Sequence, residues 1–170
     1  MRRGYTLIEL LVVIAVTTMI ASIVVIYGTS GREQVAVSIE TAKIADLISR
    51  AKARTLATYN DPNRPCGFGV ELDYAAGKYS LRGYRTSPDC ASPTGIASSN
   101  LIEEYTLAPG VSFRDGSNKL EQVLFIPPDP LTLLVIGGSF ASTTGNVYLR
   151  TRDGSVERTI SVNTAGQITF

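Results

Sequence analysis

Glu9 is the residue whose type and position most clearly demand a chemical explanation. It stands beside an uncharged stretch, because the 18 residues from Leu10 to Tyr27 contain no Asp, Glu, Lys or Arg. An ionised carboxylate in this position costs several kcal/mol in an apolar environment unless a cation pairs with it. The sequence therefore predicts a cationic partner for Glu9.

Side chains that commonly carry catalysis are sparse in the rest of the chain. There is no histidine, which excludes Ser-His-Asp and Cys-His nucleophiles and the commoner zinc sites. The acids of the turn-rich segments lack the spacing of a calcium loop: Asp115, Asp129 and Asp153. We therefore assign no catalytic residue, no metal and no cofactor, and we expect a protein that is not an enzyme.

A helix is the element that must carry Glu9 and the uncharged stretch. Eighteen helical residues at about 1.5 Å each span roughly 27 Å, close to the hydrocarbon thickness of a bilayer. A secretory signal peptide would end at a small-residue cleavage site after the apolar run, and none is present here. A simple membrane anchor explains the hydrophobicity but not the string Gly-Tyr-Thr-Leu-Ile-Glu at residues 4–9. Arg2 and Arg3 favour a cytoplasmic N-terminus.

Residues 4–16, Gly-Tyr-Thr-Leu-Ile-Glu-Leu-Leu-Val-Val-Ile-Ala-Val, closely resemble the cleavage and methylation segment of type IV prepilins and type II secretion pseudopilins. The resemblance implies that a prepilin peptidase cuts between Gly4 and Tyr5 and that Tyr5 becomes N-methylated. Two features depart from the usual pattern. The first mature residue is Tyr5 where the family usually has phenylalanine, and the leader is short.

Glu9 is the fifth residue of the mature chain under this reading. Four residues separate it from the new amine of Tyr5, so pairing within one helical turn is possible. The resemblance implies instead that Glu9 guides docking by pairing with the amine of a neighbouring subunit. It also implies three partners: the prepilin peptidase, other pilin or pseudopilin subunits, and the inner membrane.

The chain divides into four expected segments. Residues 1–4 form the cleaved leader, residues 5–31 a hydrophobic transmembrane or filament-core helix, residues 32–59 an amphipathic helix, and residues 60–170 a β-rich head. Residues 28–31, Gly-Thr-Ser-Gly, weaken any helix because each glycine costs about 0.5–1 kcal/mol. They mark either a break between two elements or a joint in one long helix; the helical pattern that resumes after them favours a joint.

Periodicity distinguishes the amphipathic helix from the head. Apolar and small residues recur at three- and four-residue steps: Val37, Thr41, Ile44, Ile48, Ala51 and Thr55. Charged residues occupy the other side: Glu40, Lys43, Asp46, Arg50 and Arg54. After residue 65 the period becomes two at 68–72 and 79–83, which predicts a hairpin of two strands. Strand-like composition predicts further strands at 101–107, 121–126 and 131–136. A final meander with turns at residues 153–154 and 165–166 predicts strands at 147–152, 156–162 and 168–170. Residues 86–100 are expected to form a loop.

Cys66 and Cys90 are the two cysteines of the chain. They fall in the segment expected outside the cytoplasm, where an even pair favours a disulfide. The bond would close a loop of about 25 residues and stabilise the fold by roughly 3 kcal/mol.

The head resembles H-type minor pseudopilins and FimT-like minor pilins. The pattern that carries this resemblance is the helix, the strands and the final motifs at residues 158–162 and 166–168. Some FimT-like proteins bind DNA through a basic C-terminal end. Here the net charge is +1 and no basic tail precedes Phe170, so nucleic acid is not an expected partner; only weak contact through Arg150, Arg152 and Arg158 is considered.

We expect an α+β, pilin-like architecture in which a long N-terminal helix, membrane-spanning in its first half, packs on an antiparallel β-sheet head. The expected function is a structural subunit of a type IV pilus or a type II secretion pseudopilus. The alternative is a minor pilin whose head binds DNA or a surface. The expected location is the inner membrane, crossed once with the head outside the cytoplasm, followed by the filament.

Overall fold

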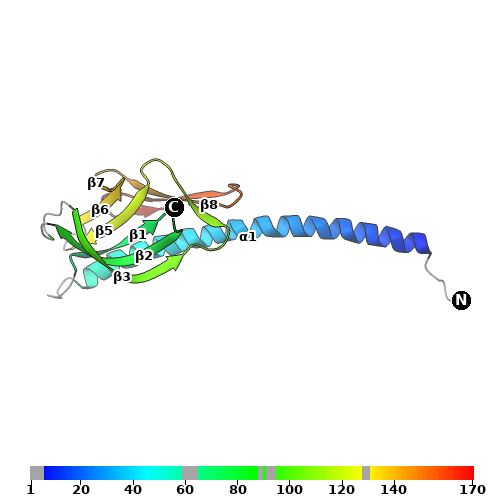
Figure 1. Cartoon of the computed structure of the whole chain (residues 1–170), viewed down its shortest axis with the longest axis horizontal. Coiled ribbons are helices and arrows are strands. Elements are labelled where there is room, and N and C mark those ends of the chain that lie inside the picture. Colours follow the sequence, from blue (N-terminus) through cyan, green and yellow to red (C-terminus); the bar gives the residue numbers. More distant parts are fainter. Residues whose placement is uncertain (1–5, 59–64, 88–89, 91–94, 128–130) are drawn as a thin grey trace.

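The computed structural model describes residues 6–58, 65–87, 90, 95–127 and 131–170, except for the side chains of residues 24–30. One helix, α1 (Leu7–Ala57), runs from an isolated stalk into a head made of strands. The second half of α1 lies along the head, whereas its first half projects away from it (Figure 1). The predicted leader, residues 1–4, and Tyr5 lie outside the described residues.

Helix α1 is continuous in its backbone through residues 28–31. The alternative of a break between two elements is therefore excluded, and the two expected helical segments form one element, in agreement with the favoured interpretation of one long helix. The helix ends at Thr58, whose backbone N–H donates to the carbonyl oxygen of Arg54 at 3.1 Å. Within the part of the chain that the structure describes, no helical stretch has both the length and the apolar character required to cross a membrane.

Six antiparallel strands form the larger sheet, in the order β3-β2-β1-β5-β6-β7. Their bounds are β1 Gly67–Asp73, β2 Lys78–Ser87, β3 Gly95–Thr106, β5 Leu120–Ile126, β6 Leu131–Ile136 and β7 Ser139–Ala141. The smaller sheet has the order β10-β9-β8-β4. Its strands are β4 Val111–Arg114, β8 Gly145–Thr151, β9 Glu157–Val162 and β10 Ile168–Thr169.

The predicted α+β class is correct, and the hairpin of β1 and β2 is confirmed. Two details differ from the expectation of one sheet with a loop at residues 86–100. The described strands divide between two sheets, and residues 95–100 belong to β3. Residues 97–100 can be Ala, Ser and Asn because they are exposed on an edge strand, which pairs with β2 through its backbone. The short strands β4 and β7 were not predicted.

Both sheets and the second half of α1 share one hydrophobic core. All of the predicted stripe on α1 is buried, from Val37 to Thr55. The Thr55 hydroxyl joins the last turns of the helix to the larger sheet: it donates to the carbonyl oxygen of Phe125 at 3.3 Å and accepts from the backbone N–H of Phe68 at 3.1 Å. Because these contacts anchor only the second half of α1, the stalk is held at one end.

Candidate assembly site on the long helix

Helix α1 begins with a capping box made by Thr6 and Glu9. The Thr6 hydroxyl oxygen accepts from the backbone N–H of Glu9 at 3.4 Å, and the Glu9 carboxylate accepts from the backbone N–H of Thr6 at 2.9 Å. The Thr6 hydroxyl also lies 3.0 Å from the same carboxylate. This arrangement satisfies donors that a helix start otherwise leaves unpaired.

The capping box gives Glu9 a second role that the sequence analysis missed. The Thr-x-x-Glu spacing is the known sequence signal for such a box, so the pattern was available. Both Thr6 contacts end on Oε2 of Glu9, and Oε1 has no hydrogen bond within the described residues. The carboxylate is therefore held in place while one oxygen stays available to a cation. Gly4 and Tyr5, the predicted cleavage and methylation residues, lie outside the described part of the chain.

The hydroxyls of the stalk are satisfied within the helix itself. Thr17 donates to the carbonyl oxygen of Val13 at 2.8 Å, Thr18 donates to that of Ile14 at 2.9 Å, and Ser22 donates to that of Met19 at 2.8 Å. An unpaired hydroxyl would cost about 1–3 kcal/mol in an apolar environment. In an apolar environment Glu9 would therefore still need a cationic partner, whereas these three hydroxyls would need none.

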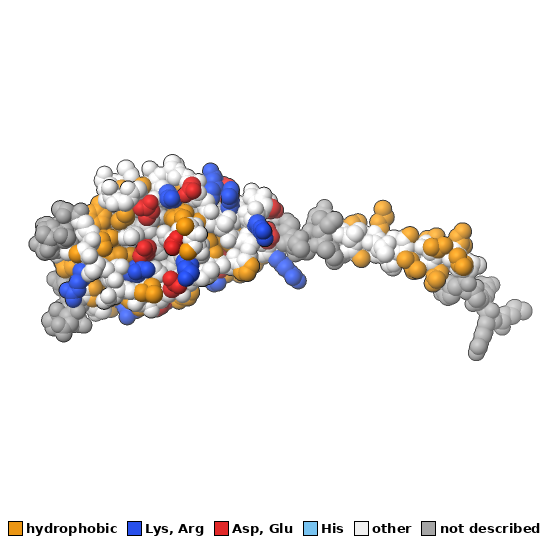
Figure 2. Space-filling view, in the orientation of Figure 1, with side chains coloured by type: hydrophobic (Ala, Val, Ile, Leu, Met, Phe, Trp, Pro, Cys, Tyr) orange, Lys and Arg blue, Asp and Glu red, His pale blue; other side chains and the backbone are white. Residues whose placement is uncertain are grey.

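Eleven large apolar side chains are exposed along the stalk: Leu7, Ile8, Leu10, Leu11, Val12, Val13, Ile14, Val16, Met19, Ile20 and Ile23. They surround the end of the helix that is far from the head, where Figure 2 shows apolar surface without Lys or Arg. Contiguous apolar surface of this kind marks an interaction site. Burial of one such side chain is favourable by about 1.5–3 kcal/mol. Contact of the stalk with apolar partners is therefore favoured.

Glu40 departs from the predicted charged face of α1. Its side chain is buried, where its carboxylate accepts from the Tyr79 hydroxyl at 3.0 Å and from Nζ of Lys43 at 2.8 Å. Burial, together with the hydrogen bond to Glu40, raises the pKa of the Tyr79 hydroxyl. The remaining charged residues of the predicted face are exposed. Glu40 therefore fixes the helix against β2 and does not belong to a solvated surface.

Replacing Tyr79 with phenylalanine is expected to lower the free energy of unfolding by about 1–3 kcal/mol, because it leaves one Glu40 oxygen without its donor. Tyr105 provides the matched control: its ring stacks on Tyr79 with centroids 5.5 Å apart, but its hydroxyl bonds to an exposed carboxylate. Tyr105→Phe should change stability by less than about 0.5 kcal/mol. Urea unfolding of the full chain measures both variants, and equal effects would contradict a special role for the Glu40 contact.

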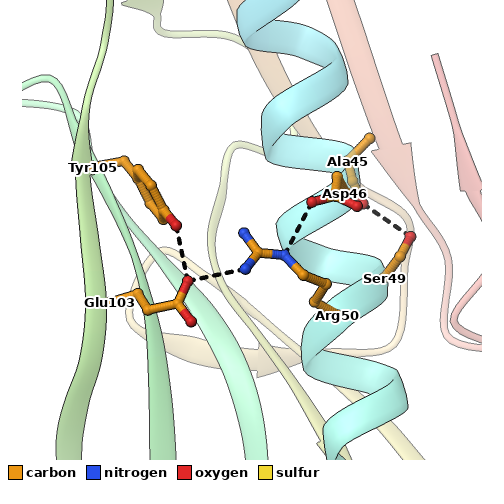
Figure 3. Close-up of polar contacts among 6 residues, drawn as sticks. All are labelled: Ala45, Asp46, Ser49, Arg50, Glu103 and Tyr105. Atoms are coloured by element: carbon orange, nitrogen blue, oxygen red, sulfur yellow. Dashed lines mark hydrogen bonds and ion pairs between the residues drawn. The ribbon is translucent and has the colours of Figure 1, made fainter.

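A second polar cluster connects the exposed side of α1 to the edge strand β3 (Figure 3). Arg50 donates to Asp46 at 2.9 Å and to Glu103 at 3.0 Å, and the Tyr105 hydroxyl donates to Glu103 at 2.8 Å. The hydrogen bond from Tyr105, and then the contact with Arg50, lower the pKa of the Glu103 carboxyl. The cluster joins the helix to β3. Because its Arg50 and Glu103 side chains are 45% and 34% exposed, solvent screens the ion pair and its contribution to stability is small.

Cys66 and Cys90 are joined by a disulfide, with Cα atoms 5.1 Å apart. Cys66 directly precedes β1, and Cys90 lies between β2 and β3, so the bond fastens the connection that leads to the edge strand.

Thiol alkylation of native, unreduced protein is expected to label neither cysteine. Replacing both with serine should lower the free energy of unfolding by roughly 3 kcal/mol, because the unfolded chain regains the freedom of the loop. Unfolding of the double variant beside reduced parent protein measures this effect. Two labelled thiols in the native parent would refute the bond.

Arg150, Arg152 and Arg158 do not form one patch. Arg158 lies opposite Leu149 in the pairing of β8 and β9, whereas Arg150 lies opposite Glu157. Cross-strand partners share a face of the sheet, and Leu149 is fully buried against the core. Arg158 therefore starts on the helix-facing side, Arg150 points to the other side, and Arg152 lies in the turn between the strands.

This separation predicts no useful binding of duplex DNA by the head. A fragment beginning at Glu33 should give no mobility shift at micromolar concentration, because nonspecific binding of a near-neutral chain is expected at about 10⁻⁴ M or weaker. A salt-sensitive micromolar shift, lost when the three arginines are replaced together, would contradict this prediction and support a DNA-binding head.

The architecture joins a helix with an exposed apolar end to a β-rich head. Residues 1–25 match the family model of the prokaryotic N-terminal methylation motif, which supports a type IV prepilin- or pseudopilin-type protein. The motif indicates a structural subunit. No curated protein and no solved structure gave a significant match to the chain.

Proposed function

We propose that this protein is a structural subunit that assembles through α1 into a type IV pilus or a type II secretion pseudopilus. The observation that carries the proposal is the stalk: its apolar side chains are exposed, and the hydroxyls of Thr17, Thr18 and Ser22 are bonded within the helix. Such a surface suits a bundle of like helices, where water is excluded and backbone and hydroxyl groups must find partners internally.

Before assembly, the proposed location is the inner membrane, crossed once, with the head outside the cytoplasm. The uncharged residues from Leu10 to Tyr27 and the preceding Arg2 and Arg3 support this topology. Cleavage between Gly4 and Tyr5 would remove the two arginines together with the leader. The remaining N-terminus would carry the methylated amine of Tyr5.

Glu9 is the proposed docking charge of the mature subunit. A hydrated carboxylate at the membrane surface needs no partner, whereas one surrounded by neighbouring helices does. The amine of Tyr5, from the same or a neighbouring subunit, is the partner implied by the resemblance. The capping box supports this role because it positions the carboxylate and leaves Oε1 unoccupied by Thr6.

Fractionation of cells into membranes and sheared filaments tests the proposal. We expect full-length precursor in the membrane fraction and the processed form in filaments, with the mass of a chain that begins at methylated Tyr5. A protein that begins at Met1, or that is cut beyond Tyr27, would overturn the prepilin assignment. A processed protein absent from filaments would overturn the assembly role alone.

A further inference from the structure

Strand β3 is a long edge of the larger sheet. It has 12 residues, whereas the other edge strands of the two sheets, β4, β7 and β10, have 4, 3 and 2 residues. Among the described residues, no backbone hydrogen bond joins β3 to any element other than β2. Short length, lysine and proline protect many edge strands from further pairing, and β3 has none of these features. Its outer backbone groups are therefore available to another strand.

Two bulges divide β3 into two regular runs, residues 98–101 and residues 103–106. The β2 partners of Asn100 and Tyr105 are four positions apart, so these two side chains lie on the same face of the sheet, roughly 13 Å from each other. Tyr105 stacks there on Tyr79, a residue of the core beneath α1. The side of β3 that carries Asn100 and Tyr105 is therefore the side that faces the helix.

A hollow of about 190 Å³ lies beside the second run, between β3 and α1. Its walls are the rings of Tyr79 and Tyr105 and the side chains of Lys43, Asp46 and Arg50; we call it the tyrosine pocket. Figure 3 shows Tyr105 and Arg50 facing each other across this space. Pockets for small-molecule ligands usually measure about 300–1,000 Å³. The tyrosine pocket is smaller, and its two rings suit one aromatic side chain.

A second hollow, of about 240 Å³, lies beside the first run; we call it the arginine pocket. Its polar side chains are Arg85, Ser98 and Asn100, and no acid lines it. The Arg54 guanidinium lies 5.2 Å from the centre of the Phe68 ring, which forms another wall. Both arginines are exposed, and neither makes an ion pair with a described residue. The arginine pocket therefore suits a carboxylate.

The acids of β3 do not supply that carboxylate, because both already have partners. Glu103 pairs with Arg50 at 3.0 Å, and Glu104 pairs with Lys78 at 2.8 Å. The two arginines beside the first run thus give this part of the edge a positive charge that a ligand can complement.

We infer that β3 binds an extended, acidic segment of a partner protein by strand addition. The segment runs antiparallel to β3, as the strands of this sheet do to one another. Its aromatic side chain enters the tyrosine pocket, and a carboxylate four residues later enters the arginine pocket. Backbone hydrogen bonds supply affinity in this mode of recognition, and pockets for alternate side chains supply specificity. The inference concerns the head alone and does not depend on assembly through α1.

Peptide binding to the full chain in detergent tests the inference. The probe is Thr-Phe-Thr-Val-Thr-Asp-Thr, amidated at its C-terminus and labelled with a fluorophore at its N-terminus. We expect a dissociation constant below about 1 mM by fluorescence anisotropy. The bound peptide should also slow hydrogen exchange of amides within residues 98–106 by about tenfold. Absence of binding, or binding that leaves exchange in β3 unchanged, would overturn the inference.

Methylation of single backbone nitrogens in the probe tests strand addition directly. Successive N–H groups of a strand point to opposite edges, so only one of two adjacent nitrogens can donate to β3. Methylation of the Val nitrogen and methylation of the following Thr nitrogen should therefore differ in effect, one weakening binding about tenfold and the other leaving it nearly unchanged. Equal effects would overturn pairing through the backbone.

Side-chain changes test the two pockets. Replacing Phe of the probe with Ala, or Asp with Asn, should weaken binding about tenfold. Arg85→Gln should weaken binding of the original probe to a similar extent, whereas Arg150→Gln, at an exposed arginine of the smaller sheet, should leave it unchanged. Arg85→Gln should weaken the Asn probe little further. Additive losses in this cycle would overturn the contact between the carboxylate and Arg85.

Discussion

Glu9→Gln is expected to leave membrane insertion and cleavage intact while lowering the share of the protein in filaments by about a hundredfold or more. The reason is that removal of one partner from a buried ion pair costs about 3–5 kcal/mol. Glutamine leaves no charged carboxylate behind, but the amine of Tyr5, the proposed partner of Glu9, becomes unpaired. The measurement compares the amounts of each variant in membranes and in sheared filaments.

Two further variants separate the charge of Glu9 from its part in the capping box. Glutamine can still complete such a box at this position, whereas Glu9→Val removes both the charge and the cap. Thr6→Ala keeps the charge but removes the cap, at a cost of about 1 kcal/mol. If charge guides docking, Glu9→Gln and Glu9→Val fail alike and Thr6→Ala assembles better than either. Equal incorporation of Glu9→Val and the parent would show that no charge pair guides docking.

Gly4→Leu is expected to leave essentially all of the protein as uncleaved precursor in the membrane. The resemblance places the cut directly after Gly4, where a branched side chain replaces a hydrogen atom. Without the cut, Arg2 and Arg3 stay attached to a helix that must enter an apolar bundle, and two unpaired cations are costly there. The N-terminal mass and the filament fraction are the measurements.

Gly31→Ala provides the control for a glycine change in the same helix. A methyl group at Gly31 meets no atom within 4 Å, and alanine favours a helix by about 1 kcal/mol over glycine. This variant should therefore be cleaved normally. Normal cleavage of Gly4→Leu at the same bond would remove Gly4 from the proposed site and would require another processing signal.

Local patterns in the sequence determined much of the architecture. The three- and four-residue spacing from Val37 to Thr55 predicted a stripe that is buried in full, because helical geometry places such residues on one face whatever they pack against. Alternating residues predicted β1 and β2 well, and strand-like composition predicted β6. Gly154 and Gly166 were predicted as turns, and both adopt positive φ, at 72° and 68°. The segment at residues 4–16 alone indicated the prepilin-type class.

Tertiary structure decided which of the expected surfaces exist. Glu40 has the spacing of the charged face, but the position of β2 buries it and provides Tyr79 as its partner. The spacing of residues along one helix cannot predict the burial of Glu40, because it does not show how far the neighbouring sheet extends around that helix.

Similarly, Arg150 and Arg158 are close in sequence, but strand alternation sends them to opposite faces, and only the packing of α1 identifies which face is the inner one. A groove between α1 and the hairpin of β8 and β9, lined by residues that include Val35, Ile39, Val156 and Arg158, arises from the same cause. Its two walls, separated by more than a hundred residues in the sequence, meet because the second sheet folds back against the helix.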